Sequence, residues 1–253
     1  MFRSGSTFRI LEETEDLLVL DKAPGVMVHP TRPSLERTML HDIRDLLAYE
    51  IAAGAVPGII NRLDRETSGL VLIAKNSAAS RRCGLLMQDR EVRKSYLAIA
   101  CGQVPSGKSF VVEEPILRLS DEENFEGEIW LKRGVHPRGQ YAKTEFHLLQ
   151  AWEDERVGPM CLLKCHPVTG RTHQIRVHLA WCGLPILGDK LYGPSDTYYL
   201  EFIRHGWSES LAATLHHRRQ ALHSAELSMV FDGQQYAWKC PLAEDLQAWL
   251  PRG

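Results

Sequence analysis

One stretch of the sequence, NRLDRETSG at residues 61–69, concentrates charged side chains directly before an apolar run at residues 70–74. Its central acid, Asp64, has Arg62 two residues before it and Arg65 directly after it. Arginines within about 4–6 Å of a carboxylate favour its ionised form, which suits a nucleophile or a base and does not suit a general acid. The alternative is a loop carboxylate that is only tied to its neighbours, and spacing alone leaves both interpretations open.

Several familiar kinds of site are missing from the sequence. It contains no GxxxxGK[ST] phosphate loop, no GxGxxG after a strand, no HExxH and no GxSxG. Cys161, Cys165 and His166 could form a metal cluster, but no second matching pair follows, and alternate residues of a buried strand give the same pattern. We therefore expect core cysteines, no metal and no cofactor.

The apolar pattern predicts the elements that position Asp64. The even apolarity of residues 70–74 indicates a strand that is buried on both faces. Asn76 or Ser77 is then expected to cap a helix, because a side-chain oxygen at that position satisfies a free backbone N–H. The stretch RKSYLAIACG, residues 93–102, predicts that the chain returns as a strand.

A second strand, turn and helix are predicted further along the chain. Residues 160–166 form an apolar strand pattern, the turn PVTG follows, and a helix is expected over about residues 172–182 with Gly183 ending it. On this helix Arg176 lies roughly 100° around from Ile175. We expect the Arg176 side chain to project past the edge of the core toward a cleft.

Two regions have less regular patterns. Two short apolar runs lie on either side of the turn signal at residues 23–25, which suggests paired strands. Residues 126–152 mix short strand-like runs with turns and overlap an acidic segment at residues 121–128. We interpret residues 126–152 as a flexible or partner-facing insertion.

The composition is that of an ordinary globular protein, with 44% hydrophobic and 25% charged residues in 253 and a net charge of −2. There is no secretory signal and no apolar run near the roughly 20 residues of a membrane span, and the six scattered cysteines do not form a disulfide framework. We expect a soluble cytoplasmic protein. Basic residues outnumber acidic ones over residues 61–98 and 160–193, which indicates polyanion binding if the two segments meet, or otherwise solvated faces of mixed sign.

Five motifs occur in an order and at spacings that resemble the RluA-type pseudouridine synthases of bacterial RNA. The resemblance spans about residues 9–233, and its motifs are LVLDKAPGVMVHP, NRLDRETSGLVLIAK, RKSYLAIACG, HPVTGRTHQIRVHLAWCGLPILGDKLYG and ALHSAELSM. It implies an α/β (α+β) fold: one catalytic domain over residues 1–253 with a bent, mostly antiparallel mixed sheet flanked by helices and a cleft between two halves. It also implies a domain without the small N-terminal S4-like RNA-binding module of some relatives.

The resemblance assigns roles to individual residues. Asp64 matches the aspartate that attacks the target uridine, at the ribose or at the base. Tyr96 matches the tyrosine that packs on the target base, and Arg176 matches the arginine that pairs with the catalytic aspartate. The substrate-binding residues that we expect are Arg62, Leu222, Arg65, Arg171 and His173. Asn61 departs from the histidine that is usual before Arg-Leu-Asp, and because asparagine also donates and accepts hydrogen bonds, we expect a loop-shaping role to survive.

The function that this resemblance implies is the isomerisation of specific uridines in ribosomal or transfer RNA, by a cytoplasmic monomer with RNA as its partner and no membrane or metal. One carboxylate kept ionised, an aromatic wall and a dry pocket are sufficient in kind for such a reaction. Two alternatives are a hydrolase of N-glycosidic bonds, which would release free uracil, and a non-catalytic RNA-binding protein.

Overall fold

The computed structural model describes residues 7–29, 37–104 and 107–251. The chain divides into two compact units. Unit 1 comprises Met1–Lys94 and His223–Gln247, and unit 2 comprises Ser95–Leu222 and Ala248–Gly253. None of the described helices combines the length and the apolar character that crossing a bilayer requires.

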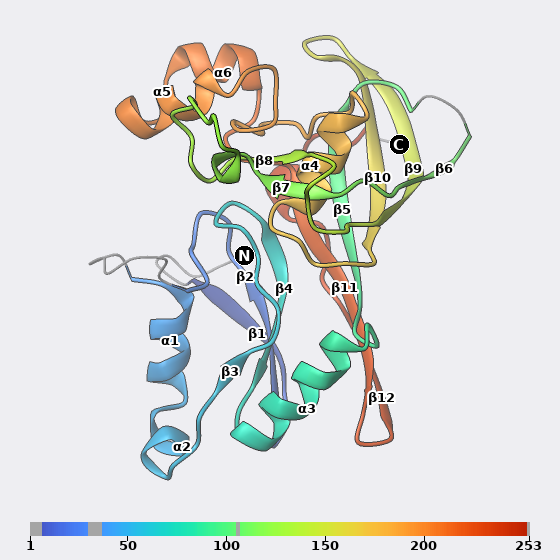
Figure 1. The fold of residues 1–253 in the computed structure, drawn as a ribbon. Helices are drawn as coiled ribbons and strands as arrows, with labels where there is room; N and C mark the ends of the chain where they lie inside the picture. The colour runs from blue at the N-terminus through green and yellow to red at the C-terminus, as the bar shows by residue number, and fades with distance from the viewer. Residues whose placement is uncertain (1–6, 30–36, 105–106, 252–253) are drawn as a thin grey trace. The chain divides into compact units, whose positions relative to one another are not determined.

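Unit 1 is built on a sheet in which the strands follow the order β1-β2-β4-β11-β12, with β3 also paired to β4 (Figure 1). All pairs are antiparallel except β4 with β11, which run parallel. The strands are β1 (Phe8–Glu13), β2 (Leu17–Lys22), β3 (Gly58–Ile59), β4 (Ser68–Ala74), β11 (Leu222–Phe231) and β12 (Gln234–Lys239). The helices are α1 (Met39–Leu46), α2 (Ala48–Ala52), α3 (Ser77–Gln88) and α7 (Glu244–Gln247).

Strand β4 is the centre of unit 1, and it confirms the prediction made from residues 70–74. Every residue of β4 is buried, and Leu72 is 0% exposed. The core around it combines Leu70 and Leu72 with Leu227 of β11 and Cys83 of α3. The predicted cap of α3 is also confirmed, because the side chain of Asn76 accepts a hydrogen bond from the N–H of Ala79 at 2.9 Å.

The prediction of two strands paired across a turn at residues 23–25 places the turn wrongly. The strands β1 and β2 do pair, but the chain reverses between them at Thr14, whose hydroxyl accepts from Leu17 N while its N–H donates to Leu17 O. The turn at residues 23–25 follows β2 instead. The carbonyls of Met27 and Val28 then accept from the first N–H groups of α1, so this segment completes a helix start rather than a strand.

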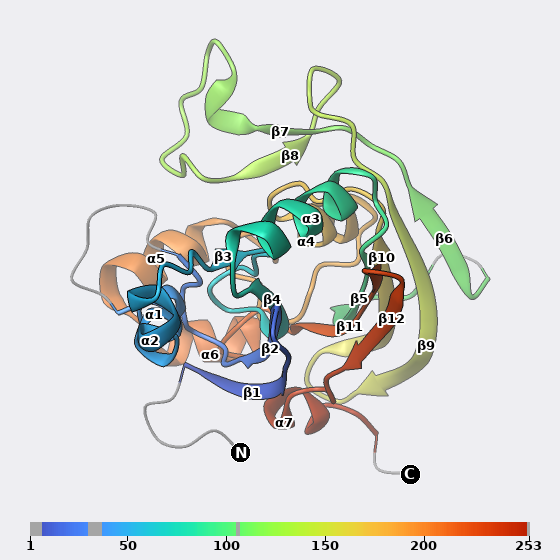
Figure 2. The same ribbon diagram turned by 90° about the horizontal axis from the view of Figure 1, so that it is seen from below.

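Unit 2 has a four-stranded antiparallel sheet in the order β5-β10-β9-β6 and a separate hairpin, β7-β8. Figure 2 shows β6 running along the curved pair of β9 and β10. The strands are β5 (Arg93–Cys101), β6 (Ser109–Val112), β7 (Ile116–Arg118), β8 (Arg133–Val135), β9 (Thr144–Asp154) and β10 (Gly158–Pro167). The helices are the 3₁₀ turn η1 (Leu119–Asp121), α4 (Gln174–Trp181), α5 (Thr197–His205) and α6 (Glu209–Leu215).

The interpretation of residues 126–152 as an insertion is wrong for its second half. Strand β9 pairs with β10 along its whole length, and its inward residues Thr144 and Phe146 are fully buried. The ring of Phe146 stacks on that of Phe110 in β6 with 4.8 Å between centroids. The alternation of buried and exposed residues over this strand is the pattern of a sheet with one covered face.

The predicted helix over residues 172–182 is α4, which begins two residues later. His173 takes a left-handed conformation with φ 59°, so regular helix starts only at Gln174. Gly183 ends the helix with φ 73°, as predicted. The fold class is confirmed: both units combine helices with mostly antiparallel strands. That the two units form one catalytic domain with a cleft between two halves stays a prediction.

Candidate active site

Asp64 lies in the loop of unit 1 that joins β3 to β4, and the start of this loop is fixed by Asn61. The Asn61 side chain is buried; its Nδ2 donates to the carbonyl of Leu70 at 3.1 Å, and its Oδ1 accepts from the N–H of Leu72 at 2.7 Å. Asn61 therefore binds the backbone of β4 much as a neighbouring strand would. This confirms the predicted loop-shaping role and explains why an asparagine serves at this position.

A buried lysine fixes the middle of the loop. The Lys22 side chain is 0% exposed, and its ammonium group donates to the carbonyls of Ala23, Val26 and Arg65 at 2.8, 2.9 and 3.0 Å. The Arg65 side chain returns the contact, since its Nε donates to the carbonyl of Gly25 at 3.0 Å. The residue directly after Asp64 is thus joined to the turn at residues 23–26 through both its backbone and its side chain.

The end of the loop is packed against β11. Gly69 has φ +105°, and a Cβ atom there would lie 2.2 Å from the carbonyl oxygen of Ser224, so only glycine fits. Beside it, the hydroxyl of Ser68 lies 3.0 Å from Nδ1 of His223. These contacts hold residues at the start of β4 against a strand that lies more than 150 positions away in the sequence.

Within this fixed loop, buried and exposed side chains alternate. Leu63 and Thr67 are buried, Asp64 is half-buried, and Arg62 and Arg65 are exposed. The carbonyl of Asp64 also accepts from the N–H of Thr67 at 3.1 Å, which closes a turn around the acid. The loop therefore presents one carboxylate between two arginines from a backbone that has little freedom to move.

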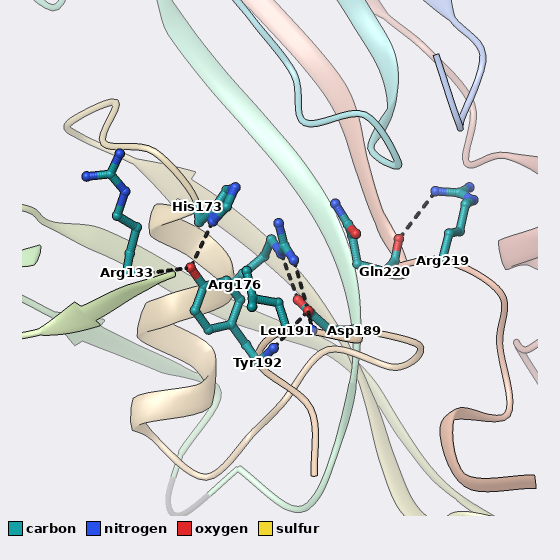
Figure 3. A network of polar contacts seen from close by, with 8 residues as sticks. All are labelled: Arg133, His173, Arg176, Asp189, Leu191, Tyr192, Arg219 and Gln220. Carbon is teal, nitrogen blue, oxygen red and sulfur yellow. Dashed lines mark hydrogen bonds and ion pairs between the residues drawn. The ribbon is translucent and has the colours of Figure 1, made fainter. Parts of the chain in front are cut away.

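Arg176 in unit 2 makes a two-pronged ion pair with Asp189 (Figure 3). Its Nε lies 2.7 Å from Oδ2 and its Nη2 lies 2.9 Å from Oδ1 of that carboxylate. Arg176 is only 6% exposed, so the prediction that it projects past the edge of the core is wrong. Burial is tolerated because Asp189 neutralises the guanidinium and the ring of Tyr192 packs against it, with 4.9 Å from Cζ to the ring centroid.

Asp189 stays ionised although it is fully buried. Burial by itself raises the pKa of its carboxyl, but the charge and hydrogen bonds of Arg176 and the N–H groups of Tyr192 and Leu191 outweigh it and hold the pKa below its ordinary value. Those two N–H groups each donate to Oδ1 at 3.0 Å. The geometry of the guanidinium is therefore set by a carboxylate that is itself held by the backbone.

The hydroxyl of Tyr192 contacts two further elements at this place. It accepts a hydrogen bond from the backbone N–H of Arg133 on β8 at 3.0 Å, and it lies 2.8 Å from Nδ1 of His173 at the start of α4. Figure 3 shows the side chains of Arg133, His173 and Arg176 extending toward the same side of this network. Predicted site residues His173 and Arg176 thus share one partner, Tyr192.

Gln174, the first residue of α4, organises the loop that carries Arg171. Its Oε1 accepts from the hydroxyl of Thr169 at 2.6 Å and from the N–H of Arg171 at 3.0 Å, while its Nε2 donates to the carbonyl of Lys143 at 2.8 Å. The exposed Arg171 side chain uses Nε to bind the carbonyl of Tyr141 at 2.9 Å. Its position at the surface is compatible with the expected contact to substrate.

The remaining predicted residues of unit 2 are apolar or aromatic and buried. Tyr96 lies on β5 opposite Cys165 of β10 and is 9% exposed. Leu222, 4% exposed, follows a short segment in which the Arg219 side chain donates to the carbonyls of Gln220 and Leu222, both at 3.4 Å. The structure therefore groups the predicted residues in two sets: Asp64, Arg62 and Arg65 in unit 1, and Tyr96, Arg171, His173, Arg176 and Leu222 in unit 2.

Three residues that matter for this geometry were not among those predicted: Lys22, Asp189 and Tyr192. A signal for Asp189 existed, since it is the single acid in the basic segment at residues 160–193. An isolated acid among bases points to an ion pair, although the sequence does not say with which base. Lys22 binds backbone carbonyls, and Tyr192 makes its hydrogen bonds with its hydroxyl group. Neither kind of contact gives a recognisable pattern in the sequence.

The cysteine interpretation is confirmed where the structure tests it. Cys161 and Cys165 lie on β10, are buried and are free thiols. Burial raises the pKa of Cys161 to about 11 and that of Cys165 well above the usual value, as expected of inert core thiols. In the part of the chain that the structure describes, no three His, Cys, Asp or Glu side chains are grouped so as to hold a metal ion.

A family model for RNA pseudouridylate synthases matches residues 16–181. The "Ribosomal large subunit pseudouridine synthase D" of Yersinia pestis is 34% identical over 242 residues, which is 94% of this chain and 68% of that protein. The enzyme of the same name from Nitrosomonas europaea is 34% identical over 246 residues, 96% of this chain and 64% of its own length. The chain thus spans about two thirds of the length of these curated relatives.

Solved structures show the same fold. "Human RNA Pseudouridylate Synthase Domain Containing 4" aligns with a TM-score of 0.71 over 94% of this chain and 90% of its own, at 24% identity. "Human RNA Pseudouridylate Synthase Domain Containing 1" aligns with a TM-score of 0.68 over 98% and 90%, also at 24% identity.

The chain belongs to the RNA pseudouridylate synthase family. It is an RNA pseudouridine synthase, an isomerase, and the resemblance to the RluA type noted from its motifs is confirmed.

Proposed function

We propose that this chain isomerises specific uridines of ribosomal RNA to pseudouridine, with Asp64 as the nucleophile. The choice of ribosomal over transfer RNA is supported by the relatives from Yersinia pestis and Nitrosomonas europaea, whose names specify the large ribosomal subunit. The choice of Asp64 is supported by its place in the NRLDRETSG motif and by its two flanking arginines.

The reaction balances without any added group. The bond between N1 of uracil and C1′ of ribose breaks, the base turns, and a bond forms between C5 and C1′. The proton on C5 leaves and N1 gains one, so nothing is oxidised or reduced. A carboxylate that attacks the nucleoside, and a protein wall that retains the loose base, are therefore the chemical requirements, and no cofactor is needed.

The observation that carries the proposal is the fixed backbone around Asp64. Asn61 fixes the residues before it, Lys22 and Gly25 bind Arg65 after it, and Gly69 packs against β11 at the end of the loop. A nucleophile is most effective when its approach to the reacting atom requires no rearrangement. A loop carboxylate with a merely solvated role would not require three sets of contacts to the backbone around it.

The other roles follow from the contacts in unit 2. Arg176 is proposed to pair with Asp64, and its bidentate contact with Asp189 would hold the guanidinium in one orientation for that purpose. Tyr96 is proposed to pack on the target base and Leu222 to line its pocket, while Arg62 helps to hold the space that the flipped nucleotide leaves. The residues proposed to contact the rest of the RNA are Arg65, Arg171 and His173.

We further propose that the enzyme acts as a monomer in the cytoplasm, where ribosomal RNA is assembled into subunits. Size-exclusion chromatography coupled to light scattering tests the first point, and cell fractionation tests the second.

The test of the function compares RNA from three strains: one lacking the gene, one complemented with the wild type, and one complemented with Asp64→Asn. Pseudouridines are mapped in ribosomal and transfer RNA. We expect one or more sites in large-subunit ribosomal RNA to be lost without the gene, restored by the wild type and not restored by Asp64→Asn. Glu66→Gln is the matched control, because it neutralises an acid of the same loop and should restore the sites.

A different experimental result would refute each part of the proposal. Lost sites confined to transfer RNA would refute the ribosomal assignment, and full restoration by Asp64→Asn would refute the nucleophile. With purified protein and RNA carrying tritium at C5 of uridine, tritium release should accompany pseudouridine formation. Release of free uracil instead would identify a hydrolase.

A further inference from the structure

Arg133, the first residue of β8, has an unusual environment for an arginine. Its backbone N–H is bound by the hydroxyl of Tyr192, so its position beside the Arg176 site is fixed. In the described residues, its side-chain Nε is buried without a hydrogen-bond partner, and no carboxylate lies within ion-pair distance of its guanidinium. A buried donor left unsatisfied costs about 1–3 kcal/mol, more when the group is charged.

The basic side chains near Arg133 differ from it in this respect. Lys132, its neighbour in the sequence, pairs with Asp196 at 2.6 Å, and Arg118, opposite it in the β7-β8 hairpin, lies 3.6 Å from Asp121. Arg138 pairs with Glu122. The acidic residues of this region are therefore distributed over its other bases, and Arg133 is the basic side chain of the hairpin that they leave without a pair.

The surroundings of Arg133 favour an anion. Figure 3 shows its side chain extending toward the same side of the network as those of His173 and Arg176. The nearest acid of that network, Asp189, is buried and already accepts hydrogen bonds from Arg176 and from two backbone N–H groups. Asp189 neutralises Arg176, so the positive charge that the protein leaves without a countercharge on this side is that of Arg133.

We propose that Arg133 binds a backbone phosphate of the RNA substrate beside the Arg176 site. This inference rests on the proposed function, since it requires RNA to lie against this part of unit 2. A phosphodiester offers two non-bridging oxygens, which the planar guanidinium of arginine binds with two parallel hydrogen bonds. The two Nη groups of Arg133, whose guanidinium has no acid within ion-pair distance in the described residues, supply the donors of such a fork.

The test compares Arg133→Gln with Lys132→Gln. Both variants remove one positive charge from adjacent residues of the same hairpin, but Lys132 has an acid partner in the protein. The substrate is an unmodified transcript of large-subunit ribosomal RNA with tritium at C5 of uridine, and the readout is tritium release at several salt concentrations. Nonproductive binding of the enzyme elsewhere on the transcript does not change kcat/KM, so this ratio reports only productive binding.

For Arg133→Gln we expect KM to rise about 10-fold with kcat nearly unchanged, as for the loss of one charge-assisted contact made equally in the ground and transition states. The dependence of log kcat/KM on log salt concentration should become shallower by about 0.7–0.9, the value for one lost phosphate contact. Arg133→Lys should restore the salt dependence but only part of KM, because an ammonium group keeps the charge and loses the fork. Lys132→Gln should match the wild type in both.

Thermal melting separates this role from a structural one. If Arg133 serves only to hold the hairpin, Arg133→Gln should lower the melting temperature; if its donor is reserved for RNA, the melting temperature should stay within about 2 °C of the wild type. An Arg133→Gln enzyme with wild-type KM and salt dependence would overturn the proposal while leaving the proposed function intact. A wild-type enzyme that forms no pseudouridine in this RNA would overturn the ribosomal assignment first, and the Arg133 contact with it.

Discussion

Replacing Asp189 with asparagine should be one of the most damaging single-atom changes in unit 2. Oδ1 of Asp189 accepts from Arg176 and from the N–H groups of Leu191 and Tyr192, and an asparagine oxygen could keep these three bonds. Oδ2, however, accepts from Nε of Arg176 at 2.7 Å. In Asp189→Asn an NH₂ group would face that N–H, so two donors would oppose each other and the guanidinium would lose its countercharge.

The magnitude follows from the burial of both partners. Asp189 is 0% and Arg176 6% exposed, so water does not solvate the guanidinium charge that remains in Asp189→Asn. Removing one member of a buried ion pair costs about 3–5 kcal/mol in the free energy of unfolding. For a chain of this length each 1 kcal/mol lowers the melting temperature by about 2–4 °C, and we therefore expect a fall of about 6–20 °C.

The assay is thermal and urea unfolding of Asp189→Asn beside the control Asp196→Asn. Asp196 also carries an ion pair, to Lys132 at 2.6 Å, but its side chain is 39% exposed, so its loss should cost no more than about 1 kcal/mol. Pseudouridine formation by Asp189→Asn should fall as well, since Arg176 loses the partner that orients it. A double variant with Asp189→Asn and Arg176→Met should recover part of the stability without recovering activity, because no buried charge remains and the asparagine oxygen keeps the two backbone N–H bonds.

The dependence on pH gives an independent check. The pKa of Asp189 is lower in the folded protein than its ordinary value of 3.8, so its contribution to stability is complete above that value and is lost as the pH falls through the folded pKa. The difference in unfolding free energy between wild type and Asp189→Asn should accordingly be constant near neutral pH and shrink below about pH 4. If Asp189→Asn melts within about 2 °C of the wild type at pH 7, the ion pair does not stabilise unit 2.

Three further predictions concern the Asp64 loop and the core thiols. Asn61→Ala should lower the free energy of unfolding by about 1–3 kcal/mol and reduce tritium release, whereas Asn61→His, which can also donate and accept, should lose less of either; equal losses would refute the hydrogen-bond argument. Gly69→Ala should be more destabilising in urea than Gly54→Ala, because both have positive φ but only Gly69 lacks room for a Cβ; equal midpoints would show that backbone strain alone matters. Iodoacetamide at pH 8 should leave Cys161 and Cys165 unmodified in the native protein and alkylate both in urea, as mass spectrometry of the peptides would show; rapid native labelling would contradict their burial.

Features that depend on nearby residues could be predicted from the sequence. The five consecutive apolar residues of β4 require burial on both faces, and the asparagine before α3 supplies a cap whichever way the helix packs. The placement of Asp64 on the loop before β4 follows from the same pattern. In each case the physical cause acts within a few positions of the residue concerned.

Features that depend on distant residues could not be predicted in this way. The pairing of Arg176 with Asp189 crosses 13 positions and a loop, and helical spacing alone placed Arg176 at the core edge because no local pattern reveals the countercharge. Strand β9 looked irregular because its register against β10 shifts between Leu162 and Leu163, which interrupts the alternation of buried and exposed residues. The contact of Lys22 with the carbonyl of Arg65 joins residues 43 positions apart and involves backbone atoms, which every residue has.

The parallel pairing of β4 with β11 determines when the Asp64 loop can complete its folding during protein synthesis. Ser68 and Gly69 leave the ribosome early, but their partners His223 and Ser224 are added only after nearly all of unit 2 has been made. Since domains commonly fold as the chain emerges, most of unit 2 can fold before the loop receives its last contacts. A nascent chain that stops before β11 would then lack the contacts that hold Ser68 and Gly69, so the order of synthesis itself would delay activity until β11 has been made.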